Sequence, residues 1–77
     1  MKMNTYEVRY DYLVGGKYRP GGVRVIEARN KKEACAARKA EYWMAVAGWE
    51  SLGYSHNAAR RKVRWPFHIE ATRVNAE

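Results

Sequence analysis

Apolar and polar residues alternate in two segments of the chain, one near its N-terminus and one near its C-terminus. In "TYEVRYDYLV", residues 5–14, every second residue is apolar, and the same holds for "VRWPFHIEAT", residues 63–72. A period of two predicts a strand that buries one face, so we expect strands over both segments. Pro66 has no amide hydrogen, so the later strand should lie at a sheet edge or begin its pairing after the proline.

A strand is also expected over residues 23–29, "VRVIEAR", although its alternation is less regular. Val25 and Ile26 are adjacent and apolar, which predicts a bulge or burial on both faces. Between this strand and the first lies "GGKYRPGG", residues 15–22, with a glycine pair at each end. Glycines supply positive φ angles and mobility, so we expect a long hairpin loop here rather than a tight turn.

The apolar period changes to that of a helix after Asn30. Asn30 can act as an N-cap, and Glu33 follows three residues later, as in a capping box. We therefore expect a helix over residues 31–48. The apolar stripe expected to face the sheet consists of Ala36, Ala37, Ala40, Trp43, Met44 and Ala47. The face opposite this stripe carries Lys31, Lys32, Arg38 and Lys39.

These elements predict a single small α+β domain over residues 1–77. The order is β-β-α-β, with a three-stranded antiparallel sheet and one helix packed on one of its faces. In a chain of 77 residues, of which 47% are hydrophobic, one thin core is expected. Its expected members are Tyr6, Val8, Tyr10, Val25, Ala37, Ala40, Met44, Phe67 and Ile69, with Trp43 and Trp65 at its ends.

The last turns of the expected helix are apolar on nearly all sides, because Tyr42, Val46 and Trp49 lie outside the stripe. These side chains need a cover. The segment "ESLGYSHNAARRK", an irregular connection with a short helical turn at "HNAARR", could supply it. A second copy of the chain could also do so, which predicts a weak homodimer.

The charge of the chain indicates acidic partners. Fifteen Lys and Arg against eight Asp and Glu give a net charge of +7, which favours nucleic acid or an anionic protein surface, although solubility alone would also account for it. A single cysteine, Cys35, permits no internal disulfide and suits a reducing cytoplasm. The chain has no apolar run of membrane-spanning length and no apolar leader segment, so we expect a cytoplasmic protein without membrane contact.

The sequence contains no recognisable catalytic, cofactor or metal site. His68 and Glu70 spell the H-x-E of zinc deaminases, but the cysteine pair that completes that motif does not follow. The glycine pairs join two strands rather than a strand and a helix, so neither forms a phosphate loop. Carboxylates are not paired at any spacing typical of acid–base catalysis. We therefore expect a protein that is not an enzyme.

Two cationic clusters are the expected partner-binding sites. The loop tip carries Lys17, Tyr18 and Arg19, and the entry to the last strand carries Arg60, Arg61, Lys62 and Arg64. Such cations can neutralise phosphates, while Tyr18 and Tyr54 could stack on exposed bases. The partner could be an acidic protein surface, a nucleoprotein complex, or DNA or RNA bound directly.

The succession of a strand, a capped alanine-rich helix and a further strand, seen around "VRVIEARNKKEACAARKAEYW", resembles small phage and mobile-element accessory proteins. Among these the chain is similar to anti-CRISPR proteins in size, in the order of its elements and in the general pattern of its residues. The resemblance implies a non-enzymatic inhibitor that binds a host defence nucleoprotein complex in the host cytoplasm and blocks its access to nucleic acid. One alternative is a small DNA- or RNA-binding accessory domain. Another is a structural subunit that dimerises through Trp49 and Tyr42.

Overall fold

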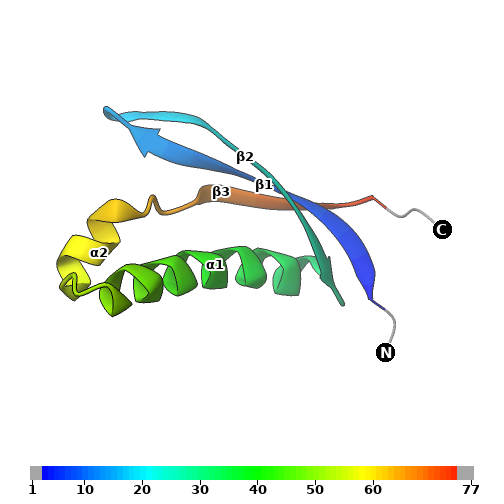
Figure 1. Ribbon diagram of the computed structural model, residues 1–77. Helices are drawn as coiled ribbons and strands as arrows, with labels where there is room; N and C mark the ends of the chain where they lie inside the picture. The colour runs from blue at the N-terminus through cyan, green and yellow to red at the C-terminus, as the bar shows by residue number, and fades with distance from the viewer. Residues whose placement is uncertain (1–2, 75–77) are drawn as a thin grey trace.

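The computed structural model describes residues 3–74, which form an α+β domain of three strands and two helices (Figure 1). Along the chain these are β1 (Asn4–Val14), β2 (Lys17–Ala28), α1 (Lys31–Ser51), α2 (His56–Lys62) and β3 (Phe67–Arg73). The strands form one antiparallel sheet in the order β2-β1-β3. The predicted antiparallel sheet is confirmed, whereas the order β-β-α-β with a single helix is wrong because α2 separates α1 from β3.

The central strand β1 follows the alternation of its sequence. Tyr6, Val8 and Tyr10 are buried, as predicted, whereas the intervening residues Glu7 and Arg9 are more accessible. The buried residues are large and fall at every second position, so their combined apolar area fixes which face of the strand meets α1. Val8 lies opposite Ala71 of β3, which places the C-terminal strand directly beside the N-terminal one.

The connection between β1 and β2 is a tight turn, and the predicted long loop is wrong. Gly15 and Gly16 have φ angles of +58° and +78°, the left-handed conformation that a two-residue hairpin turn requires. Pairing resumes at once, with Val14 opposite Lys17. Residues 17–22 therefore belong to β2, and the second glycine pair has a different role from the first.

A bulge in β2 lies beside this second pair rather than at Val25. Tyr10 is paired with Gly22 and Asp11 with Pro20, which leaves Gly21 as the extra residue. A Cβ atom on Gly21 would lie 2.8 Å from Cδ2 of Tyr10. The expected bulge at Val25 is not found, because pairing continues without a shift from Val25 opposite Glu7 to Ile26 opposite Tyr6. Two-sided burial is not found either, because Val25 is 71% exposed.

Adding a methyl group at Gly21 is expected to lower the free energy of unfolding by about 1–3 kcal/mol, the usual cost of overpacking. A shift of the Tyr10 ring would also disturb its contact with the Arg38 guanidinium, which lies 4.0 Å from the ring centroid. Gly48→Ala is the matched control, since Gly48 lies in α1 with open space around it and should gain up to about 1 kcal/mol. Urea denaturation of both variants measures the difference, and a Gly21→Ala variant as stable as the parent would refute the close approach.

The start of α1 is fixed by the predicted capping residues. The side-chain oxygen of Asn30 accepts a hydrogen bond of 2.8 Å from the Glu33 amide. The Glu33 carboxylate accepts from the Arg29 side chain at 2.7 Å and from the Arg29 amide at 3.3 Å, and these bonds lower the pKa of Glu33. The helix begins at Lys31 as predicted and continues to Ser51, three residues past the predicted end.

The buried face of α1 differs from the predicted stripe. Its buried residues are Ala34, Arg38, Tyr42 and Val46, one on each successive turn. Met44, expected in the core, is 73% exposed, and Trp43 is 46% exposed. Arg38, expected on the outer face, is only 6% exposed. The predicted stripe consists mainly of alanines, whose small apolar area gives only a weak preference for burial. Tyr42 and Val46 bury far more apolar surface and therefore determine which face of α1 packs inward.

The described residues contain two small cores, joined by α1. The sheet core comprises Tyr6, Val8, Ala28, Ala34 and Ala71. The helical core comprises Tyr42, Val46 and Ala59, with Trp49, Val63 and Trp65 packed against it. Val63 and Trp65 therefore contribute to the helical core and not to β3, which begins only at Phe67, after the buried Pro66.

The segment after α1 covers the residues that prompted the homodimer prediction. Tyr42 and Val46 are buried within one chain by α2 and the residues that follow it, as the alternative reading of "ESLGYSHNAARRK" anticipated. A second copy is therefore not needed to cover them. The short helical turn expected at "HNAARR" is the helix α2.

Candidate nucleic-acid interface

Helix α2 presents three cations beside the helical core. Ser55 caps its start, accepting a hydrogen bond of 3.2 Å from the Ala58 amide, and Ala59 anchors it in the core. The last turn consists of the exposed residues Arg60, Arg61 and Lys62. Positive charges at the C-terminal end of a helix interact favourably with its dipole, so the sequence stabilises the helix and displays the cations together.

These cations lie over aromatic rings from α1 and the turn that follows it. The Arg60 guanidinium is 5.9 Å from the centroid of the Trp43 ring. The Lys62 ammonium group is 5.1 Å from the Tyr54 ring and 5.5 Å from the Trp49 ring. Cation–π contacts of this length at an exposed surface are worth about 0.5–1 kcal/mol each. The surface is thus both cationic and aromatic.

The aromatic side chains under α2 contact one another edge to face. Tyr42 lies 4.8 Å from Trp65 and 4.9 Å from Trp43 between ring centroids, and Trp43 lies 6.0 Å from Trp65. Tyr42 is buried, whereas Trp43 keeps nearly half of its surface exposed. Core contacts therefore hold the Trp43 ring in place while one part of it faces solvent.

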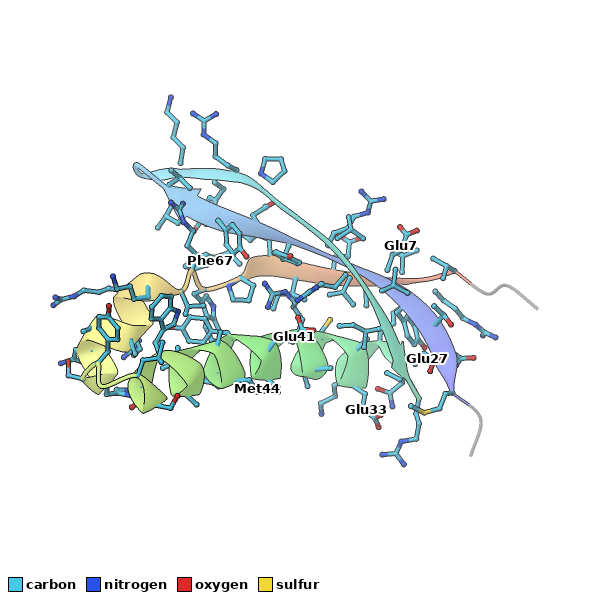
Figure 2. All side chains as sticks on the ribbon, in the orientation of Figure 1. Glu7, Glu27, Glu33, Glu41, Met44 and Phe67 are labelled. Atoms are coloured by element: carbon cyan, nitrogen blue, oxygen red, sulfur yellow. The ribbon has the colours of Figure 1, made fainter. Side chains whose placement is uncertain are left out.

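Two shallow depressions flank Arg60. One, of about 310 Å³, is lined by Tyr42, Asn57, Arg60 and Arg61. The other, of about 400 Å³, is lined by Tyr42, Trp43, Arg60, Trp65 and Phe67. Because they share Tyr42 and Arg60, they adjoin. Figure 2 shows the labelled Phe67 at the end of β3 that lies toward α2.

The second predicted cluster lies on the hairpin rather than on a mobile loop tip. Lys17, Tyr18 and Arg19 are exposed residues at the start of β2, and the hairpin tip and α2 lie at the same end of the molecule (Figure 1). The Tyr18 ring packs 5.5 Å from Phe67 and 4.3 Å from His68, between centroids. Phe67 thus contacts Tyr18 and also borders the aromatic depression, which links the two clusters.

Acidic side chains lie at both ends of the domain, and those near α2 are Glu50, 3.2 Å from His56, and Asp11, 3.1 Å from His68. Figure 2 shows Glu7, Glu27 and Glu33 toward the end of the molecule opposite α2. Arg64, the remaining predicted site residue, is exposed in the connection between α2 and β3. The exposed cations of α2, its exit and the hairpin outnumber the acidic side chains beside them, so this end of the domain suits an anionic partner.

The cations of this surface were predicted from the sequence, whereas its aromatic residues were not predicted to belong to it. Trp43, Trp65 and Phe67 were expected in the core, and Asn57 received no role. A usable signal was present, because three tryptophans and Tyr54 fall between residues 43 and 65, around the same basic run. Aromatic residues interleaved with cations are typical of surfaces that bind single-stranded nucleic acid.

The histidines lie in exposed contacts. His68 has Nδ1 3.1 Å from Oδ2 of Asp11, and His56 has Nδ1 3.2 Å from Oε2 of Glu50. His68 has a φ of +52° at an irregularity in the pairing of β1 with β3.

Within residues 3–74, groups of three or more His, Cys, Asp or Glu side chains placed to hold a metal ion are absent. None of the described helices has the length and apolar character to cross a membrane.

Comparison of the chain with protein-family models, with curated proteins and with solved structures gives no match.

Proposed function

We propose that this protein is a non-enzymatic binding protein that attaches to nucleic acid through the surface formed by α2 and the aromatic residues beneath it. The observation that supports this is the placement of Arg60 and Lys62 over half-exposed aromatic rings. Nucleic acid offers phosphates for the cations and ring faces for the aromatic residues. An acidic protein surface offers carboxylates to the cations but no succession of exposed bases to the aromatic residues.

The resemblance to anti-CRISPR proteins implies a more specific form of the proposal. The nucleic acid would then belong to a host defence complex in the cytoplasm, and the protein would inhibit that complex by blocking its access to its target. The net charge of +7 supports such binding, because the nucleic-acid strands of such a complex carry phosphates.

Replacing Arg60, Arg61 and Lys62 together with glutamine is expected to weaken binding to nucleic acid roughly a hundredfold at about 0.1 M salt. Each lost phosphate contact on a single strand should also lower the slope of log affinity against log salt by about 0.7, or about 2 for the three. Fluorescence anisotropy with labelled 20-nucleotide DNA and RNA strands and with their duplexes, over a range of salt concentrations, measures both quantities.

Replacement of Lys31, Lys32 and Lys39 with glutamine is the matched control, since it removes the same charge from α1. An equal loss in both variants would contradict the assignment to α2. If none of the nucleic acids binds the parent protein, the proposal of direct binding is wrong. Inhibition of a host defence complex is tested separately, by adding the protein to purified CRISPR effector complexes and measuring how well they bind their target nucleic acid. Unchanged target binding would contradict this form of the proposal.

A further inference from the structure

We infer that the surface at α2 binds an unpaired nucleotide, with the base in the aromatic depression and its phosphate in the adjoining cationic one. This rests on the proposed function and adds that the recognised strand is single-stranded. It also assigns a base-stacking role to Trp43, which charge alone would not indicate.

The aromatic depression has room for a base and a lining suited to stacking. Its volume of about 400 Å³ lies near the lower end of the roughly 300–1,000 Å³ typical of small-molecule pockets. Of its lining residues, four are aromatic and one is an arginine. A purine or pyrimidine would meet ring faces and edges here, and such stacking tolerates any base because every base has a π-face.

The gap between Arg60 and Trp43 suits a planar ligand. The guanidinium stands 5.9 Å from the indole centroid, close to the outer limit of a cation–π contact, whereas the buried Arg38 stands 4.0 Å from Tyr10. A base stacked between two planar groups would separate them by roughly 7 Å, twice the spacing of stacked bases. Arg60 is exposed at the end of α2, so a small rotation of its side chain opens the gap by the remaining distance.

The cationic depression lies where the phosphate of that nucleotide would be. Asn57, Arg60 and Arg61 are spaced i, i+3 and i+4 along α2, so they share one face of the helix. Two guanidinium groups and an amide supply several N–H donors, which suit phosphate oxygens. The depression adjoins the aromatic one at Arg60 and Tyr42, so one nucleotide can occupy both. In a duplex the base is paired and stacked, and only the phosphate could bind.

The test compares Trp43→Ala with Met44→Ala, using a 20-nucleotide thymidine strand and a 20-base-pair duplex as probes. Met44 is the next residue of α1, is 73% exposed and lines neither depression. Trp43→Ala should weaken single-strand binding roughly five- to hundredfold without changing its salt slope. Duplex binding should be unaffected by Trp43→Ala, and Met44→Ala should leave both unchanged. Binding of the strand should also quench tryptophan fluorescence in the parent protein.

Trp43→Phe keeps an aromatic face and should keep most of the affinity, whereas Trp43→Leu should not. This pair gives the answer even if Trp43→Ala unfolds. The inference is overturned if duplex and single strand bind equally, or if loss of the ring has no more effect than Met44→Ala. In those cases the proposed function is still tested by the loss of binding when Arg60, Arg61 and Lys62 are replaced with glutamine. Absence of binding to every oligonucleotide would instead refute the proposed function of direct nucleic-acid binding.

Discussion

Replacing Arg38 with alanine is expected to lower the free energy of unfolding by about 3 kcal/mol, the range of large-to-small substitutions in a core. The Arg38 side chain fills the space between α1 and the sheet, with its guanidinium over the Tyr10 ring and an Nη2 donor 3.3 Å from the Tyr12 hydroxyl. The Glu41 carboxylate lies 3.5 Å from Arg38 and is shared with Arg24, 3.1 Å away, and Figure 2 shows Glu41 between α1 and the sheet. Alanine would remove the packing and the cation–π contact together.

Arg38→Met is the informative control, because methionine keeps a long apolar stem without the charge. Burial of the Arg38 charge is costly, and its Nε atom lacks a hydrogen-bond partner among the described residues. Buried ion pairs replaced by apolar side chains of similar volume are often neutral or stabilising, so Arg38→Met should lie within about 1 kcal/mol of the parent. Urea denaturation followed by circular dichroism measures both variants. Equal losses in the two would show that the charge, rather than the packing, stabilises this contact.

Tyr42→Ala should destabilise the protein by about 3–5 kcal/mol, the usual cost of removing a buried aromatic side chain. Tyr42 is central to the helical core, where its ring contacts Trp43 and Trp65. Its loss would leave α2 without its main partner on α1. In a domain this small the whole stability is of a similar size, so thermal unfolding should move to much lower temperature.

Tyr42→Phe separates the ring from the hydroxyl group. Because the ring contacts are kept, this variant should unfold within about 1 kcal/mol of the parent. Near-ultraviolet circular dichroism of the tryptophans reports the packing of the same core directly. If Tyr42→Ala unfolded at the temperature of the parent, α2 would have to be held by other contacts, and the division into two cores would be wrong.

The elements of this fold could be predicted wherever large side chains repeat or a capping residue marks a boundary. The alternation of Tyr6, Val8 and Tyr10 predicted the central strand, and Asn30 predicted the first residue of α1. The buried face of α1 was not predictable in the same way, since its alanines occur on several sides. Burial of Arg38 depends on two tyrosines of β1, which only the folded sheet brings beneath it.

The two glycine pairs illustrate a second limit of predicting structure from this sequence. Gly15–Gly16 and Gly21–Gly22 look equivalent in the sequence, yet the first makes the turn and the second admits the Tyr10 ring beside a bulge. A tight turn at the first pair fixes the register of β2 against β1. Which glycine pair forms the turn therefore depends on how the whole strands pair, and not on the glycines themselves. The candidate site shows the same division, because the cations are local in sequence whereas the depressions combine α1, α2 and β3.

The two cores differ in how far apart their residues lie along the chain. The helical core draws on residues between Tyr42 and Trp65, whereas the sheet core requires β3 to pair with β1 from the other end of the described chain. Contacts of low sequence separation form faster than those that close long loops. The α1–α2 hairpin, with the proposed binding surface upon it, should therefore assemble early in folding, and docking of β3 beside β1 should be the late, slow step.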